Sequence, residues 1–163
     1  MKINQVMTPQ VHACQVGDTL NRAAQLMWEN ECGCVPVIES DGTGAVAGMI
    51  TDRDICMATY TQGKPLFEIP VATAMAHRVI SCHPDDEVLR VEALMRMNRV
   101  RRIPVLDERG QLKGIVSLDD LACEAEREKM VSIVPQITLS EVAETLAAVC
   151  DHRGQEKQTA LAG

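Results

Sequence analysis

Aromatic side chains are almost absent from this sequence. Among 163 residues there is one Trp, one Tyr and one Phe, although 46% of the residues are hydrophobic. The core must therefore be built from Val, Ile, Leu, Met and Ala. A flat ligand would have to lie between aliphatic side chains, because there are too few aromatic rings to stack on both of its faces.

Positive charge is also in short supply. The formal net charge is −7 at pH 7, which argues against a broad nucleic-acid or membrane surface. An anionic ligand would need cations gathered locally. No apolar run approaches the length of a membrane span, and the N-terminus, Met1 to Asn4, lacks the apolar region of a signal peptide. We therefore expect a soluble cytoplasmic protein.

Recognisable catalytic motifs are missing as well. The chain contains no P-loop, no Gly-rich dinucleotide turn, no H-E-x-x-H and no nucleophile motif. Seven Cys residues, an odd number, occur without a secretion signal, which indicates reduced thiols and not a disulfide framework. We expect that the protein is not an enzyme and requires no cofactor.

What the chain does contain is an internal repeat. Residues 7–38 align with residues 75–106 at a constant offset of 68, and the match resumes at an offset of 66, where residues 48–54 align with 114–120. Two copies of one unit can pair about a pseudo-two-fold axis, and such pairing creates related clefts. Ten aligned pairs are identical: Met7/Met75, Val11/Val79, Cys14/Cys82, Asp18/Asp86, Arg22/Arg90, Leu26/Leu94, Met27/Met95, Asn30/Asn98, Pro36/Pro104 and Val37/Val105.

Each copy predicts the same order of elements. A short extended stretch is followed by a helix, with Asp18 and Asp86 at the expected N-caps and Asn30 and Asn98 near the expected helix ends. Two apolar runs joined by a polar, Gly-containing loop then predict a hairpin, and a second helix follows. The fold class is therefore α/β (α+β), with two β-α-β-β-α repeats packed about a pseudo-two-fold axis.

Proline and composition refine these expectations. Pro36 and Pro104 cannot donate to a ladder, so we expect them on an edge strand or at a strand start. We expect the first repeat over residues 1–66, the second over 67–130, and a C-terminal helix and tail over 131–163. The helix from Ser140 to Cys150 should present one apolar face, and Asp151 to Gly163 should be disordered. That face would consist of Val142, Leu146 and Val149.

The ends of the two copies resemble the CBS-domain family. The segment Gly48-Met49-Ile50-Thr51-Asp52-Arg53-Asp54 closely matches the family pattern G-h-h-[ST]-x-x-D, in which h is apolar, and Gly114-Ile115-Val116-Ser117-Leu118-Asp119-Asp120 also fits it. The Val-Pro-Val and Ile-Pro-Val strands lie at the family's usual distance upstream. The chain therefore resembles a stand-alone tandem CBS pair, or Bateman module, from Val6 to Glu126.

The resemblance implies a function. Such pairs bind AMP, ADP, ATP or S-adenosylmethionine in the clefts between copies, commonly form homodimers through the repeats, and regulate a fused domain or a separate partner. No fused enzyme or channel is present in this sequence, so the regulated protein would be a separate molecule. Partners in the form of a membrane or a nucleic acid are not expected.

The S/T-x-x-D segments have two interpretations. At a nucleotide site, Asp54 and Asp120 would accept from ribose hydroxyls, while the hydroxyls of Thr51 and Ser117 and the N–H groups of the helix starts would donate to phosphate. Alternatively each segment is a capping box, which needs no ligand. The duplication favours the ligand site, and the two roles are compatible.

The cations are distributed unequally between the copies. Arg101 and Arg102 occupy the positions two and three residues before the strand proline, which often contact phosphate in the family, and Arg can bind phosphate with two parallel hydrogen bonds. The alternative is a solvated helix end. The equivalent positions of the first copy are Gly33 and Cys34, which carry no charge. The two clefts should therefore differ in their preference for phosphate.

Remaining candidate contacts divide between the two clefts. The backbone of Val79-Ile80 would bind the adenine edge in the cleft with Thr51, Asp54 and the two arginines, and the backbone of Val11-His12 would do so in the cleft with Ser117 and Asp120. Arg53 would be the cation of the second cleft. Ordinary strand packing explains the same stretches equally well.

Two further functions stay open. Cys32 and Cys34, completed by His77 and His83, could form a zinc- or redox-responsive site, although C-x-C is not the usual C-x-x-C spacing of structural zinc. The chain could also be a structural dimer with empty clefts. Binding of either an adenosine ligand or zinc to the native state would raise the melting temperature of the protein by linkage.

Overall fold

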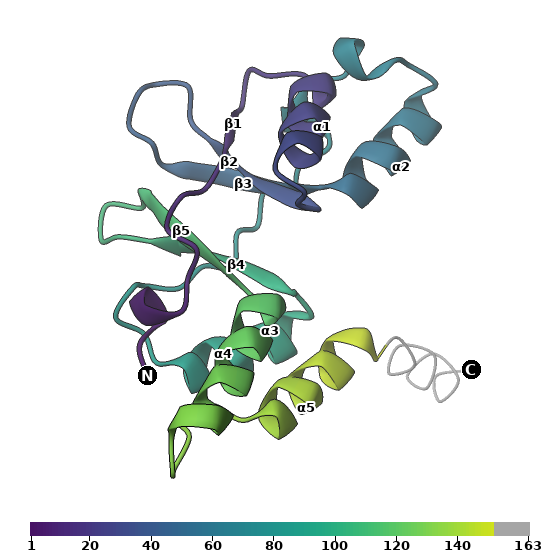
Figure 1. Ribbon diagram of the computed structural model, residues 1–163. Coiled ribbons are helices and arrows are strands. Elements are labelled where there is room, and N and C mark those ends of the chain that lie inside the picture. Colours follow the sequence, from purple (N-terminus) through teal and green to yellow (C-terminus); the bar gives the residue numbers. More distant parts are fainter. Residues whose placement is uncertain (152–163) are drawn as a thin grey trace, which may run out of the picture. The chain divides into compact units, whose positions relative to one another are not determined.

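The computed structural model describes residues 1–151. The expected disorder of the tail concerns mainly residues 152–163, which lie outside the described part. Figure 1 shows a mixed α/β chain with the elements in the following order: η1 (Ile3–Gln5), β1 (Cys14–Gln15), α1 (Leu20–Glu29), β2 (Cys34–Ile38), β3 (Val46–Thr51), α2 (Asp52–Gln62), η2 (Leu66–Glu68), η3 (Val71–Thr73), α3 (Val88–Asn98), β4 (Arg102–Leu106), β5 (Leu112–Ser117), α4 (Leu118–Val131) and α5 (Leu139–Cys150).

Contacts divide the chain into two compact units. Unit 1 contains Met1–Met7, Pro84–Ile103 and the described residues from Ile115 onward, and unit 2 contains Thr8–His83 and Pro104–Gly114. The domain boundaries expected from the repeat stay predictions.

Unit 2 is built on a three-stranded sheet with the order β1-β2-β3. Strand β1 runs parallel to β2, with Cys14 opposite Val37, and β3 runs antiparallel to β2, with Pro36 opposite Met49. The N–H and C=O groups of Met49 bond to Ala76 on the other side of β3, at 3.1 and 2.8 Å. The backbone N–H and C=O groups of Met49 therefore point away from β2. Its partner Pro36 thus occupies a position where the β2–β3 ladder requires no donor.

This geometry corrects the expectation for Pro36. The residue lies at the centre of β2, the middle strand of the sheet, and neither at an edge nor at a strand start. It is tolerated because β1 is only two residues long and begins opposite Val37, so no acceptor of β1 faces the proline nitrogen.

The second copy repeats this pattern with β4 and β5, which pair with each other. Cys82 forms a parallel bridge with Val105, as Cys14 does with Val37, and is held by bonds to Pro104 O and from Leu106 N–H at 3.2 and 2.9 Å. The predicted β-α-β-β-α order is therefore confirmed in the first copy, and in the second copy the first strand is reduced to the single bridge at Cys82.

The starts of α1 and α3 differ from the prediction. The N-cap residues are Thr19 and Glu87, neither of which makes a side-chain capping bond, so assigning these caps to Asp18 and Asp86 was wrong by one residue. Asp18 instead accepts a hydrogen bond from the N–H of Gln15 at 2.8 Å. Its carboxylate thus stabilises the turn before the helix and not the helix start itself.

The helix ends also use Asn in an unexpected way. Asn30 donates its side-chain amide to Leu26 O at 2.8 Å, and Asn98 makes the same bond to Leu94 O at 2.9 Å. Glu31 (φ 49°) and Arg99 (φ 54°), the next residues, adopt the left-handed conformation. The asparagines therefore satisfy backbone carbonyls of the last turn instead of providing the helix stop.

The core is aliphatic, as expected from the composition. No aromatic residue belongs to the buried cluster of unit 2, which consists of Cys14, Leu20, Ala23, Leu26, Met27, Val35, Val37, Ile50, Ile55, Ile69, Val71 and Met75. Unit 1 has its own buried residues, among them Ile3, Val91, Met95, Leu121 and Ile137.

Helix α5 packs against α3 and α4 inside unit 1, as Figure 1 shows. Val142 and Val149 are buried as predicted, but Leu146 is exposed and Thr145 is fully buried in its place. Over residues 1–151, no helix has the length and hydropathy needed to cross a bilayer. All seven cysteines lie in this part of the chain, and none forms a disulfide.

Candidate functional site

Thr51 and Asp54 form a complete capping box at the start of α2. The N–H and hydroxyl of Thr51 donate to Asp54 Oδ2 at 2.9 and 2.7 Å, and the N–H of Asp54 donates back to Thr51 Oγ1 at 3.2 Å. The structural interpretation of this segment is therefore correct. It fixes the carboxylate of Asp54 and the hydroxyl of Thr51 on the first turn of the helix.

Ser117 and Asp120 form the same arrangement at the start of α4. The N–H and hydroxyl of Ser117 donate to Asp120 Oδ2 at 2.7 and 2.5 Å, and the N–H of Asp120 donates to Ser117 Oγ at 3.1 Å. The two segments that carry the family pattern therefore have matching local geometry.

A third capping box stands outside the repeats. At the start of α5, the hydroxyl of Thr138 donates to Glu141 Oε2 at 2.7 Å and the N–H of Glu141 donates to Thr138 Oγ1 at 3.3 Å. No ligand is expected there. The hydrogen bonds alone therefore identify a helix cap, and a ligand role for Thr51 or Ser117 needs support beyond them.

Asp54 provides part of that support. The capping box occupies only Oδ2, and no hydrogen bond within residues 1–151 involves the other carboxylate oxygen, Oδ1. The side chain is half-buried, whereas the neighbouring Asp52 and Arg53 are exposed. Asp54 therefore combines a fixed orientation with an oxygen that can still accept hydrogen bonds.

The extended stretches before the strands are shorter than expected. Strand β1 begins only at Cys14, and Cys82 forms an isolated bridge, so Val11-His12 and Val79-Ile80 precede regular pairing. Val11, Val79 and Ile80 are half-buried, and His12 is exposed. All four residues belong to unit 2, as do Thr51, Arg53 and Asp54.

Arg101 and Arg102 lie beside the start of α4 in unit 1. The N–H of Leu118 donates to Arg101 O at 3.0 Å, and the first-copy equivalent is the bond from Asp52 N–H to Gly33 O at 3.1 Å. The backbone at this position therefore has one role in both copies, while the side chain is Arg in one and absent in the other. This difference is the unequal charge inferred from the sequence.

Both arginine side chains already have partners. The Nη2 group of Arg101 donates to Cys150 Sγ on α5 at 3.2 Å. Arg102 Nη2 pairs with Asp119 Oδ2 at 3.6 Å, and the carboxylate of Asp119 is almost entirely exposed. Neither partner was expected from the sequence, because Cys150 lies outside the repeats and Asp119 lies in the variable part of the S/T-x-x-D pattern.

The structure assigns the candidate residues to different units. Ser117 and Asp120 belong to unit 1 together with the two arginines, whereas Thr51 and Asp54 belong to unit 2. The expected combination of Arg101 and Arg102 with Thr51 and Asp54 therefore stays a prediction.

A buried carboxyl was missed altogether. Glu92, on α3, is fully buried, and burial raises its pKa above the ordinary value, with the carboxylate of Glu141 acting in the same direction. A signal was present in the repeat: at the offset of 68, Glu92 aligns with Ala24, so an ionisable residue replaces a small one on a helix face that packs inward.

The proposed metal ligands do not assemble. Over residues 1–151, no three or more His, Cys, Asp or Glu side chains are placed so that they could hold a metal ion. Cys32, Cys34, His77 and His83 all lie in this part of the chain, so they do not form a ready-made zinc site in this conformation.

Comparison with known proteins identifies the family. The model of the CBS domain matches residues 3–60 and 71–127. The CBS domain-containing protein YhcV of Bacillus subtilis is 36% identical over 120 residues, which cover 74% of this chain and 82% of that protein.

Solved structures agree with this assignment. Hypoxic Response Protein I, crystallised with two coordinated zinc ions, is 27% identical with a TM-score of 0.68, and the match covers 76% of this chain and 98% of that one. The CBS domain pair of protein MJ0100, in complex with 5-methylthioadenosine and S-adenosyl-L-methionine, shares the fold at 23% identity with a TM-score of 0.65, over 76% of this chain and 94% of that one. The chain belongs to the CBS-domain family and contains a tandem pair of CBS domains.

Proposed function

We propose that this protein is a regulatory module that binds an adenosine-containing ligand, namely AMP, ADP, ATP or S-adenosylmethionine, and passes the signal to a separate partner. The observation that carries the proposal is the carboxylate of Asp54, which the cap orients through Oδ2 while Oδ1 has no hydrogen-bond partner within residues 1–151. An oriented carboxylate can accept from vicinal ribose hydroxyls without a further loss of side-chain entropy. Asp120 would play the same role in the second CBS domain.

Phosphate groups would bind to Arg101 and Arg102. The present partners of these side chains are weak competitors, because a thiol is a poor acceptor and an exposed ion pair at 3.6 Å contributes little. A phosphate offers charged oxygens that can accept parallel hydrogen bonds from one guanidinium. The site with Gly33 and Cys34 in place of the two arginines would favour a ligand with less negative charge.

The adenine ring would be recognised by backbone groups. Val79-Ile80 and Val11-His12 lie outside regular pairing, so their N–H and C=O groups can bond to the edge of a base. The faces of the ring would contact aliphatic side chains, since the buried residues of both units include no aromatic side chain. Arg53 is exposed and would serve as the cation of the less charged site.

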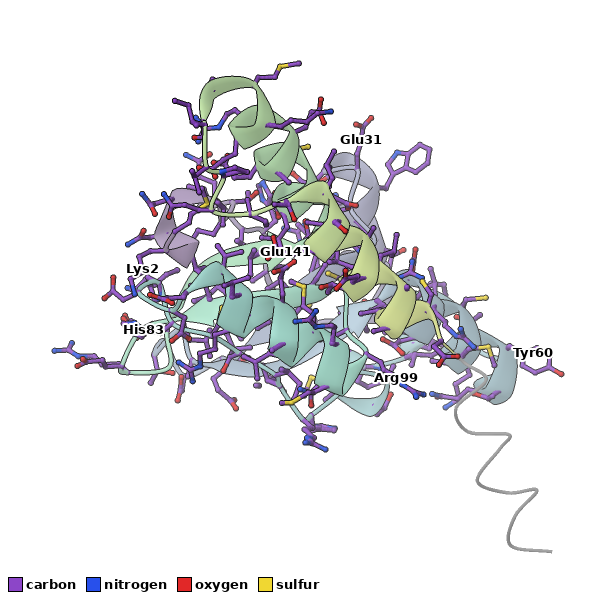
Figure 2. All side chains as sticks on the ribbon, turned by 90° about the horizontal axis from the view of Figure 1, so that it is seen from below. Lys2, Glu31, Tyr60, His83, Arg99 and Glu141 are labelled. Carbon is purple, nitrogen blue, oxygen red and sulfur yellow. The ribbon has the colours of Figure 1, made fainter. Side chains whose placement is uncertain are left out.

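Signalling would proceed by population shift, in which the ligand favours one arrangement of the protein over another. We further propose that the protein acts in the cytoplasm as a homodimer without catalytic activity. The helices α1 and α2 support the dimer, because Trp28 and Tyr60 on these helices are largely exposed, and Figure 2 shows Tyr60 extending outward from its helix.

A thermal-shift screen tests the proposal directly. A ligand at about a hundred times its Kd stabilises the native state by about 2.7 kcal/mol, or a Tm rise of roughly 5–10 °C for a chain of this size. We expect such a rise with at least one of the four adenosine ligands and none with zinc. A shift with zinc alone, or with none of the compounds, would contradict the proposal.

The variant Asp54→Asn provides the residue-level test. It keeps an oxygen that can accept from Thr51 but removes the charge and one of the two acceptors, so the ligand-induced rise in Tm should shrink. Asp52→Asn is the matched control, because Asp52 carries the same charge on the same helical turn but is exposed and takes no part in the capping box. Equal losses in the two variants would indicate a general charge effect and not a ribose contact.

A further inference from the structure

Helix α5 covers a buried acidic group in unit 1. Its inward face consists of Val142, Thr145 and Val149, which pack toward α3 and α4. Glu92 lies on the face of α3 beneath this helix and is completely shielded from solvent. Its Oε2 atom has no hydrogen-bond partner within residues 1–151. An ionised carboxylate in this position would therefore be desolvated without full compensation.

The hydroxyl of Thr145 offers the Glu92 carboxyl little compensation for its burial. Thr145 Oγ1 lies 2.9 Å from Glu141 O, in the previous turn of its own helix, and 3.4 Å from Glu92 Oε1. A hydroxyl has one hydrogen, and the shorter contact to the backbone carbonyl takes it. The longer contact, from Thr145 Oγ1 to Glu92 Oε1, is therefore weak, and an ionised Glu92 would gain little from it.

The charged groups around Glu92 mostly favour the neutral form. Desolvation raises the pKa of Glu92 most strongly, the carboxylate of Glu141 on α5 adds to this, and Glu144 on α5 contributes in the same direction. Arg96 on α3 and the hydrogen bond with Thr145 lower the pKa and only partly oppose the shift. In Figure 2, Glu141 is labelled on α5. Glu141 and Glu144, the two carboxylates that disfavour ionisation of Glu92, both belong to α5.

The repeat shows that this acid is not needed for the CBS fold. The first domain has Ala24 at the equivalent position of α1. Ala24 is half-buried against the core of unit 2 and introduces no charge. The acid is therefore found only in the copy whose first helix packs against α5, and α5 itself lies outside the repeats.

We propose that α5 is a proton-dependent latch, which docks on α3 and α4 while Glu92 is neutral and detaches when Glu92 ionises. Docking is then strongest at acidic pH, where the carboxyl is protonated in both states. It weakens as the pH rises above the ordinary value for Glu, about 4.3, by up to tenfold per pH unit, until Glu92 has ionised in the docked state as well. Opening would also break the contact between Cys150 and Arg101. The proposal concerns α5 itself and does not depend on a nucleotide.

Hydrogen exchange measured by mass spectrometry on the full chain tests the latch. Between pH 5 and pH 8, after correction for intrinsic exchange rates, peptides from α5 should lose protection with rising pH, while peptides from β2 and β3 should not. In Glu92→Gln the amide is neutral at every pH and can donate to Thr145. In this variant the protection of α5 should therefore stay constant with pH. At pH 8 the protection factor of α5 should exceed that of the wild type by tenfold or more. Glu126→Gln, which removes a partly exposed acid on α4, is the control and should behave as the wild type.

Two results would overturn the latch. One is protection of α5 that does not change with pH in the wild type, and the other is a pH dependence in Glu92→Gln that equals the wild type. If Glu92→Gln does not fold, the carboxyl carbon of Glu92 in the wild type can be titrated by NMR. A midpoint above the ordinary value for Glu supports the latch, whereas a midpoint at or below it contradicts the latch.

Discussion

Two matched threonine variants can separate the structural role of the capping boxes from a role in ligand binding. Thr51→Ala removes the hydroxyl that accepts from Asp54 N–H at 3.2 Å and donates to Asp54 Oδ2 at 2.7 Å. Thr138→Ala removes a hydroxyl with nearly the same geometry, at 3.3 and 2.7 Å from its partners on Glu141. Both threonines are half-buried. The two changes are therefore equivalent as losses of a helix cap.

Their effects on stability and on affinity should diverge. Loss of an N-cap residue costs about 1 kcal/mol in stability, so each variant should lower Tm by roughly 2–4 °C. If the Thr51 hydroxyl turns its one hydrogen from Asp54 Oδ2 to a phosphate of the ligand, its loss removes a hydrogen bond to a charged group, which contributes about 1.5–3 kcal/mol. The affinity of Thr51→Ala for ATP should then fall by roughly 10- to 150-fold, while that of Thr138→Ala should not change.

Melting curves and calorimetric titration with ATP measure the two quantities on the same protein. Equal affinities in the two variants, together with equal losses of stability, would refute the ligand role of Thr51 and leave the capping box as its only function. A large loss of affinity in Thr138→Ala would mean that α5 takes part in the site.

Three further predictions follow from individual contacts. In calorimetry, Arg102→Ala should lower the affinity for ATP by at least tenfold more than the affinity for adenosine, since only ATP carries the phosphates. Equal losses of affinity would contradict a phosphate contact. Gly48→Ala should lower the free energy of unfolding by about 1–3 kcal/mol in denaturant titration, because an added Cβ would lie 2.9 Å from the backbone oxygen of Ala76. Burial raises the pKa of Cys14 to about 11, so at pH 8 it should be alkylated far more slowly than the exposed Cys56 when both are followed by mass spectrometry.

The repeat made the fold largely predictable. Two copies with the same apolar spacing specify the same β-α-β-β-α order, and the scarcity of aromatic residues correctly indicated an aliphatic core. The Gly of the family pattern illustrates what sequence alone leaves open. Gly48 is required because the backbone at Ala76 approaches it closely, and this approach involves a segment far along the chain.

Errors arose where local chemistry has more than one solution. Asp18 can serve a turn or a helix start, and the structure uses it for the turn. Asn30 can adopt the left-handed conformation or bond back to the helix, and it bonds back while Glu31 turns. The position of Pro36 depended on the length of β1, which the sequence does not specify.

The C-terminal helix was the least predictable element. Helical spacing identified Val142 and Val149 but suggested Leu146 in place of Thr145 on the buried face. Thr145 lies on that face, where its hydroxyl donates to Glu141 O and contacts Glu92, an acid on a helix of the second CBS domain. The contact of Cys150 with Arg101 likewise required knowledge of where α5 docks.

The central claim is that the two ligand sites hold a ribose in the same way but differ in their affinity for phosphate. Calorimetric titration of the chain of residues 1–163 with ATP tests it most directly, because the stoichiometry counts the sites. We predict one strong site for each chain, lost in Arg101→Ala/Arg102→Ala, and a second site that is at least tenfold weaker or silent. Two equal sites for each chain, or the absence of any binding, would contradict the account.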